Sequence, residues 1–244
     1  MDVHYALYSA IMQHRENFSV AWENAKESTD RDILRRFLFM VLAEYPEVFY
    51  VSWEKSSIRF YDDIAEIRFW YIFSMEECRT LQKEMKKKVS QLCLVANCLC
   101  RNRKEKMMKY LYRYFVTHIS YAQEQLHSKN EQELCRIHSA VGALLDGRAV
   151  CDGIARAFKM VLDELGIENR VIRRNLQKSA EFSHEWNVIV LNGEELHADI
   201  TWEMDVYNVQ NRMMFEFFLL TEKEMQKKHQ RGKNQECFKK RDLS

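Results

Sequence analysis

Glycine and proline are scarce in this sequence, and they are unevenly placed. The 244 residues include one proline and six glycines, of which none precedes Gly142 and five lie between Gly142 and Gly193. Because these residue types mark turns, the first half is predicted to form long regular elements and the second half to bend often. No repeat or linker is evident. We therefore expect two lobes that share an interface: a helical and β-hairpin region over residues 1–103, and a region over residues 104–244 that carries the candidate site.

The sequence also lacks an excess of either charge and any long apolar run. Lys and Arg number 37 and Asp and Glu number 36, so no strong field favours a polyanion, and we expect no nucleic-acid partner. No apolar run reaches the length of a membrane span, and the first residues contain no signal-peptide core. We expect no membrane partner and, if the N-terminus is native, a cytoplasmic protein.

Cysteine is present, but not in the pattern of a disulfide scaffold. The seven cysteines are an odd number without the density of such a scaffold. Cys93, Cys98 and Cys100 suggest a metal cluster, but they fall in one predicted helix, where their offsets point the thiols in different directions. Buried free thiols are the better interpretation. We predict no metal and no other cofactor.

Hydrophobic periodicity predicts the elements of the first half. A helical pattern is ended by the single proline, and strand-like runs follow at residues 48–53 and 65–73. The stretch Ser74–Glu77 fits a capping box that opens a helix to about Cys100. An amphipathic helix follows, with an apolar side formed by Met108, Leu111, Tyr112, Phe115 and Ile119. The polar segment 121–133 is predicted to be a loop.

The stretch that begins at Gly147 reads GRAVCDGIARAFKMVLDELGI. After Cys151, apolar residues recur at helical spacing and Gly166 supplies a stop, so Cys151 is predicted to lie at the first turn of a helix. Backbone N–H groups and the positive end of the helix dipole favour a thiolate there, which is the nucleophilic form. The same N–H groups can donate to an oxyanion. By position alone, a small apolar residue that starts a helix is an equally good interpretation.

A second informative stretch begins at His184 and reads HEWNVIVLNGEELHADITW. Asn-Gly between alternating apolar residues predicts a β-hairpin with its two-residue turn at 192–193. In that register His184 faces Thr201, and Asp199 faces Trp186. All four side chains then project to one side of the sheet. As the diagonal neighbour of His184, Asp199 would bring its carboxylate within reach of the imidazole.

Together these residues have the chemistry of nucleophilic catalysis. His184 would deprotonate the Cys151 thiol and later protonate a leaving amine, while Asp199 would fix the tautomer and stabilise the imidazolium. A solvated carboxylate and a satisfied histidine are the ordinary interpretations of each residue alone. His197 on the same face could instead join Cys151 and His184 as a zinc ligand, but the spacings are not those of common zinc sites.

At these residues the sequence resembles a known family. The first stretch, extended back to Gly142, is similar to the transglutaminase-like pattern G-x-L-x-x-G-x-x-V-C-x-G-Y-A-x-A-F…L-G-I, and the second to H-A-W-N-x-V…D-x-T-W. Residues 217–225 are similar to the closing element F-L-x-S-x-x-E-M, and His229 follows it. The resemblance spans about residues 135–230. The first half looks only generally like the lead-in of bacterial members.

The resemblance implies an α+β, papain-like core in which the cysteine-bearing helix packs on an antiparallel sheet. It assigns Cys151 as nucleophile, His184 as general base and acid, and Asp199 as the residue that orients the histidine. Tryptophans at 186 and 202 match the family's, with packing as their role. The candidates for a second oxyanion donor and for the substrate pocket are Tyr121, Trp186 and Asp152.

The implied function is that of a cysteine-dependent amide hydrolase or acyl transferase acting on a protein or peptide. The family includes cross-linking enzymes, proteases and peptide N-glycanases, so the acceptor stays open, although water needs no dedicated second site. The alternative is a catalytically silent transglutaminase-like binding module. Ile154 in place of the usual aromatic, Glu185 in place of a small residue, and Arg173-Arg174 where glycine is common keep this alternative open.

Overall fold

The computed structural model describes residues 3–21, 32–52, 54–61, 63–175 and 183–232. The chain divides into two units, residues 1–82 and residues 83–244, and the division lies within one long helix, α3 (Met75–Cys100). Gln82 still donates a hydrogen bond to the carbonyl of Glu47, whereas Ser90 donates to Glu164 and Cys93 to the carbonyl of Val161. The hydrogen-bond partners of α3 thus change along the helix, and the boundary at residue 103 stays a prediction.

Unit 1 contains a three-stranded antiparallel sheet in which β3 is the central strand. On β3, Ile67 pairs with Phe18 on one side and Ile58 on the other, and it is buried. The elements of this unit, besides the start of α3, are α1 (Val3–Met12), β1 (Asn17–Ala21), α2 (Asp32–Glu44), β2 (Ser57–Tyr61) and β3 (Ile64–Arg68).

The predictions for unit 1 hold for the helices and only in part for the strands. Helix α2 ends at Glu44, just before the proline, and the Ser74 hydroxyl and Glu77 carboxylate form the predicted capping box at the start of α3. The run 48–53 contributes one bridge, between Val51 and Tyr71, and its Trp53 lies outside the described residues. The pairing partners of β3 come instead from residues 17–21 and 57–61, which have no strong apolar alternation.

Unit 2 contains a four-stranded antiparallel sheet of order β6-β7-β8-β9 and a short parallel pair, β4 with β5. After α3, its helices are α4 (Lys104–His118), η2 (Glu124–His127), α5 (Glu131–Ile137), η3 (Gly142–Asp146), α6 (Cys151–Glu164), α7 (Ile200–Gln210) and α8 (Glu222–Gly232). Its strands are β4 (Ser120–Tyr121), β5 (Arg148–Ala149), β6 (Asn169–Asn175), β7 (Ser183–Leu191), β8 (Glu194–Ala198) and β9 (Phe218–Leu220).

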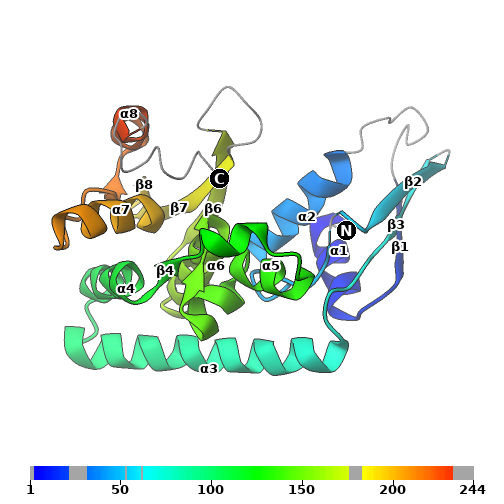
Figure 1. Ribbon diagram of the computed structural model, residues 1–244, viewed down its shortest axis with the longest axis horizontal. Coiled ribbons are helices and arrows are strands. Elements are labelled where there is room, and N and C mark those ends of the chain that lie inside the picture. Colours follow the sequence, from blue (N-terminus) through cyan, green and yellow to red (C-terminus); the bar gives the residue numbers. More distant parts are fainter. Residues whose placement is uncertain (1–2, 22–31, 53, 62, 176–182, 233–244) are drawn as a thin grey trace. The chain divides into compact units, whose positions relative to one another are not determined.

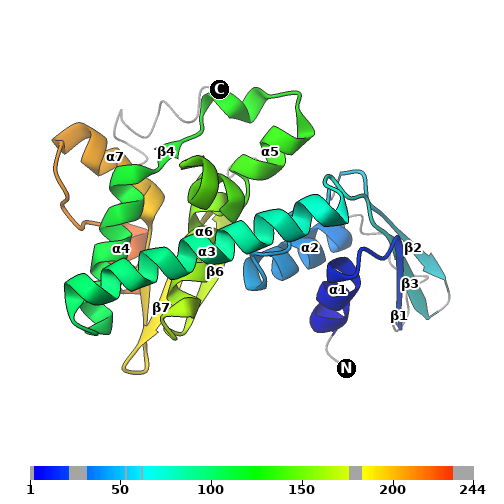
Figure 2. The same cartoon turned by 90° about the horizontal axis from the view of Figure 1, so that it is seen from below.

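Helix α6 packs against β6 and β7 of this sheet, and the α+β architecture predicted from the sequence is confirmed (Figures 1 and 2). The Asn187 side chain of β7 donates a hydrogen bond of 2.9 Å to the carbonyl of Ala155 on α6, which joins the two layers. Phe158 on α6 and Phe115 on α4 meet edge to face, with ring centroids 5.5 Å apart and both side chains fully buried. This core holds the start of α6 in a fixed relation to the sheet.

The segment predicted to be a loop, residues 121–133, is only partly irregular. It contains the end of β4, the turn η2 and the start of α5. The Asn130 side chain caps α5 by accepting hydrogen bonds from the backbone N–H groups of Gln132 and Glu133. The polar residues that suggested a loop are therefore the capping residue and first turn of a short helix.

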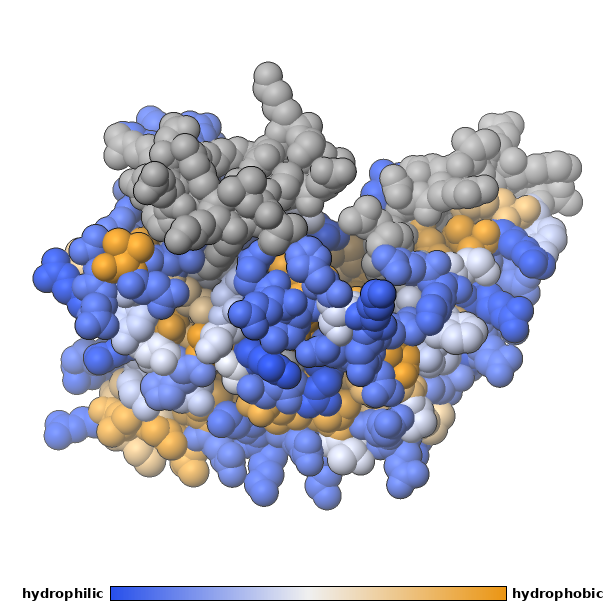
Figure 3. Space-filling view, in the orientation of Figure 1, coloured by the Kyte–Doolittle hydropathy of each residue, from blue (hydrophilic) through white to orange (hydrophobic). Residues whose placement is uncertain are grey.

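The C-terminal end of α3 presents an exposed apolar stripe. Leu94, Val95 and Leu99 are exposed, and Figure 3 shows apolar side chains gathered over this end of the helix. The nearby thiols lie in different surroundings, because Cys93 is buried, Cys98 exposed and Cys100 half-buried. The prediction that these are buried free thiols is confirmed for Cys93 and wrong for Cys98, which lies on the exposed side of the helix. Among the residues that the structure describes, no helix is both long enough and apolar enough to cross a membrane.

Candidate active site

Cys151 is the first residue of α6. Val150 before it is extended, with φ −99° and ψ −177°, and its carbonyl accepts the first helical hydrogen bond from Ile154. The N–H of Val150 is bonded to the carbonyl of Ile137, which holds the chain at the point where the helix begins. Cys151 is half-buried, while the apolar face of α6 is buried. The predicted position of the thiol at a helix N-terminus is confirmed.

Gly153 allows this helix start to lie against the preceding turn. A Cβ added there would lie 2.5 Å from the carbonyl oxygen of Ile137 and 2.7 Å from that of Ser139. Both contacts are with backbone, so the strain cannot be relieved by a side-chain rotation. We expect Gly153→Ala to destabilise the protein by at least about 2 kcal/mol. Urea unfolding measures this change in stability. An unchanged midpoint would contradict the close packing.

The hairpin that carries His184 has the predicted register up to its last pair. Leu191 pairs with Glu194 and Asn187 with Ala198, and the turn residues 192 and 193 both have positive φ. The ladder then ends. Residues Ile200 onward form α7, so the predicted pairs of His184 with Thr201 and of Asp199 with Trp186 are wrong.

Asp199 is the N-cap of α7 rather than a strand residue. Its Oδ1 accepts a hydrogen bond of 3.1 Å from the backbone N–H of Trp202, and a carboxylate in this position starts a helix readily. His184 is paired across the sheet with Arg174 of β6 instead. The two side chains still meet, but the meeting depends on a cap at the end of β8 and not on a diagonal pair across a hairpin.

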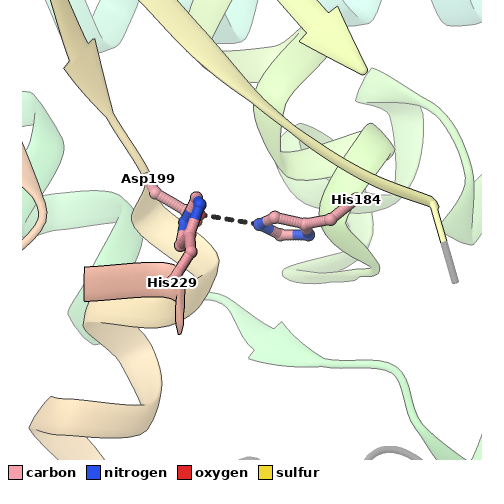
Figure 4. A group of neighbouring side chains, drawn as sticks. All are labelled: His184, Asp199 and His229. Carbon is pink, nitrogen blue, oxygen red and sulfur yellow. Dashed lines mark hydrogen bonds and ion pairs between the residues drawn. The ribbon is translucent and has the colours of Figure 1, made fainter. Parts of the chain in front are cut away.

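The imidazole of His184 and the carboxylate of Asp199 are hydrogen-bonded and buried. The distance from Nε2 to Oδ2 is 2.7 Å, and the two residues are 8% and 0% exposed (Figure 4). Since Nε2 is engaged with the carboxylate, Nδ1 is the ring nitrogen left for the Cys151 thiol. Cys151 is close enough to His184 to raise the pKa of its imidazole. The arrangement therefore places the thiol near the imidazole that the carboxylate holds.

The protonation of this pair is shifted in opposite directions. Burial would lower the pKa of His184, but the charge and hydrogen bond of Asp199, together with Cys151, outweigh it and raise the pKa to about 10. Burial would raise the pKa of Asp199, but His184 and a second histidine hold it well below its usual range. The physical result is an imidazolium–carboxylate pair in a site from which solvent is largely excluded.

The second histidine is His229 of α8, which the sequence analysis noted without giving it a role. Its Nε2 lies 2.9 Å from Oδ2 of Asp199, so two imidazoles share one carboxylate oxygen (Figure 4). His229 is 2% exposed. The sequence showed only that a histidine follows the closing element. The spacing between residues 199 and 229 did not indicate that α8 packs beside Asp199.

The main chain of Asp199 is held as firmly as its side chain. Its N–H donates to the carbonyl of Phe217, and the buried hydroxyl of Tyr112 lies 3.0 Å from the carbonyl oxygen of Asp199. One turn on, the carboxylate of Glu203 accepts hydrogen bonds from the N–H groups of Phe215 and Phe217. The start of α7 is thereby tied to α4 and to the segment that leads into β9.

His197 takes part in a separate chain of hydrogen bonds. Its Nδ1 accepts from the indole N–H of Trp186 at 2.9 Å, and its Nε2 lies 2.8 Å from Oε2 of Glu222 on α8. The zinc alternative that combined Cys151, His184 and His197 is therefore wrong, because both ring nitrogens of His197 have other partners. Among the described residues, the donor atoms close enough to hold an ion belong to His184, Asp199 and His229, and their 2.7 and 2.9 Å separations are those of N–H···O hydrogen bonds.

The three candidates for the oxyanion or pocket have different surroundings. Trp186 is 2% exposed and stacks beside His184, with ring centroids 5.5 Å apart, while its N–H is used by His197. Tyr121 pairs with Ala149, two residues before Cys151, and is half-buried. The carboxylate of Asp152 is bonded to Nδ1 of His138 and to the N–H of Gly153. Trp186 thus packs, and Asp152 accepts hydrogen bonds rather than donating them.

Glu185, which departs from the family pattern, is part of a buried group of charges. It lies 3.4 Å from the guanidinium of Arg156 and 3.6 Å from that of Arg173. Burial raises the pKa of Glu185, and the two arginines oppose this. Arg156 also donates to the carbonyl of His138. The two arginines therefore provide partners for the buried carboxylate of Glu185. Ile154, the other departure from the family pattern, is buried and packs in the core.

Comparison with known proteins relates part of unit 2 to a described family. Residues 96–204 match the model of the transglutaminase-like superfamily. A solved structure described as "Crystal structure of a TGase" is similar to the chain at 11% sequence identity with a TM-score of 0.40. The match covers 76% of this chain and 50% of the other, so the chain spans about half the length of that protein. No protein with a curated description matches the chain.

Proposed function

Residues 96–204 belong to the transglutaminase-like superfamily, and from this premise we propose that the protein is a cysteine-dependent amide hydrolase or acyl transferase. Cys151 is the nucleophile, His184 the general base and acid, and Asp199 the residue that orients His184. The observation that carries the proposal is the buried hydrogen bond by which the Asp199 carboxylate holds Nε2 of His184, with Cys151 at the start of α6 close enough to raise the pKa of the same imidazole.

The reaction begins with His184 as the imidazolium of the buried pair, which holds the proton taken from the Cys151 thiol. The Cys151 sulfur then attacks the amide carbonyl carbon, and the carbonyl oxygen takes the negative charge. Backbone N–H groups at the start of α6 stabilise that oxyanion, and Tyr121 is the candidate for the second donor. The C–N bond breaks as His184 protonates the leaving amine, which leaves a thioester on Cys151.

Water or an amine resolves the thioester. His184 removes a proton from the incoming group as it attacks the carbonyl, the C–S bond breaks, and the thiol is regenerated with a carboxylic acid or a new amide as product. The substrate is a protein or peptide that offers a glutamine side chain, another amide or a peptide bond. A screen of glutamine peptides, with and without a primary amine, separates hydrolysis from transfer.

Alkylation with iodoacetamide, followed by mass-spectrometric mapping of the labelled thiols, tests the proposed nucleophile. At pH 6 we expect Cys151 to react at least ten times faster than the exposed Cys98, because the His184–Asp199 pair lies near its thiol as a nucleophile-activating base requires. Burial raises the pKa of Cys78 to about 12 and that of Cys93 to about 11, so both should react slowly. Equal rates for Cys151 and Cys98 would favour the silent binding module instead.

A further inference from the structure

Helix α8 lies beyond the residues that match the family model, yet it supplies a contact to the candidate triad. We propose that His229 is a positioning residue, which holds the Asp199 carboxylate in the orientation that His184 requires. This inference rests on the proposed function, because it concerns the geometry of the same three groups. His229 contacts the Asp199 carboxylate, and we expect it to act through that group.

The first argument is the number and direction of the donors on Asp199. Its Oδ1 accepts from the N–H of Trp202, and its Oδ2 accepts from Nε2 of both His184 and His229. The torsion that rotates a carboxylate about its last carbon–carbon bond is intrinsically broad. Donors on both oxygens, from three different elements, define the plane of the carboxylate. Without His229, Oδ2 would be held only by the imidazole that it is meant to orient.

The second argument is the environment of His229 itself. Its ring is stacked on Phe217 with an interplanar angle of 18°, and it meets the edges or faces of Trp202 and Trp186 at centroid distances of 4.4 and 4.8 Å. An apolar side chain would fill such a space without the cost of burying a polar ring. The hydrogen bond to Asp199, and not the packing, therefore explains why a histidine occupies this position.

The third argument is that α8 is joined to the site at a second point. Glu222 at its start contacts His197, which accepts the hydrogen bond of the Trp186 indole, and Trp186 stacks beside His184. Met225, between the two polar contacts, packs in the cluster of Trp186, Trp202 and Phe217. One helix thus braces both the carboxylate and the indole that flank His184.

The test compares two isosteric substitutions. In His229→Gln the amide can still donate to Asp199, whereas in His229→Met a side chain of similar length cannot. We expect His229→Met to move the acid limb of the Cys151 alkylation profile, the part where the rate falls with falling pH, upward by about one pH unit and so to slow the reaction about tenfold on that limb, because the carboxylate loses a donor that stabilises its charge. His229→Gln should retain most of the wild-type profile.

Proton NMR of the histidine-labelled protein gives a readout independent of reactivity. Wild type should show two low-field imidazole N–H resonances, from His184 and His229, since both donate to a buried carboxylate. In His229→Met the His229 signal must vanish, and we expect that of His184 to move and to exchange faster with water. An unmoved His184 resonance with an unmoved acid limb would overturn the proposal.

The titratable groups that face Asp199 are few. They are His184 from β7, His229 from α8 and Tyr112 from α4, with Glu203 one turn along α7. Burial, with Glu203 and Asp199, raises the pKa of Tyr112 well above its usual value, so it stays neutral over the acid limb. Glu203 and Tyr112 are unchanged in all the variants, so we attribute differences among them to Asp199.

Met225→Ala is the control for loosened packing of α8. It should lower the melting temperature without moving the His184 resonance or the acid limb. If His229→Met does not fold, the His229→Gln protein provides the test. An acid limb at the wild-type pH supports the proposal, and an acid limb shifted by a full pH unit contradicts it. Wild-type Cys151 that reacts no faster than Cys98 would instead refute the proposed function, while the NMR comparison would still test the contact.

Discussion

Replacing His184 with alanine is expected to lower the rate at which an activated ester acylates Cys151 by about a thousandfold at pH 6 to 7. General base catalysis by a positioned imidazole contributes on the order of a hundredfold to ten-thousandfold. The loss should fall near the middle of this range, because in the proposed mechanism the imidazole both holds the thiol proton and neutralises the sulfur charge in a half-buried site. The acylation burst of p-nitrophenyl acetate, followed by mass spectrometry of the acyl-enzyme, measures the rate.

Two variants are needed to interpret this result. Cys151→Ala should give no acyl-enzyme at all, which identifies the acylated residue. His118→Ala removes an exposed imidazole from the end of α4 and should leave the rate within about twofold of wild type. A His184→Ala protein that folds normally and is acylated as fast as wild type would rule out His184 as the base, whatever the geometry of its contact with Asp199.

Replacing Asp199 with alanine is expected to cost about 3–5 kcal/mol of stability. The substitution removes the cap of α7 and leaves His184 and His229, which both donate to the carboxylate, buried without their acceptor. Asp199→Asn keeps an oxygen for the helix cap and should lose less stability. It should nevertheless lose activity nearly as severely as His184→Ala, because an amide cannot stabilise an imidazolium as a carboxylate does. Urea unfolding at pH 6, together with ester acylation, measures both effects.

The same pair should make stability depend on pH in a defined direction. The pKa of His184 is raised above its unfolded value of about 6.5 to about 10, so its contribution is fully present below pH 6.5 and is lost as pH rises through 10. The contribution is worth no more than about 5 kcal/mol. The pKa of Asp199 is lowered, so its contribution is present above about pH 4 and is lost as pH falls further.

Stability is therefore expected to be greatest between about pH 4 and 6.5 as far as this pair is concerned. A series of urea titrations from pH 4 to 10 measures the curve. In His184→Ala the decline between pH 6.5 and 10 should become much shallower, and that comparison removes the contribution of the other ionisable groups. Parallel curves for the two proteins would show that His184 is not an imidazolium in the folded state.

The sequence was sufficient where a structure depends on neighbours along the chain. The capping box at Ser74, the start of α6 at Cys151 and the turn at 192–193 each follow from hydrogen bonds and backbone preferences within a few residues. The register of β7 with β8 follows from that turn, since one pair sets all the others. The meeting of a thiol, an imidazole and a carboxylate could be anticipated from these local elements and from the family resemblance.

Only the tertiary structure decided what lies between those elements. The end of β8 at Ala198 depends on whether Asp199 caps a helix or extends a strand, and the contacts of its main chain with Tyr112 and Phe217 favour the cap. The contact of His229 with Asp199 joins residues thirty positions apart. The burial of Glu185 depends likewise on arginines from two other elements. Periodicity and capping rules describe free-energy differences within one segment. The contacts named here arise instead when separate segments fold together and exclude water from the same polar groups. Those groups then need hydrogen-bond partners from the segments around them.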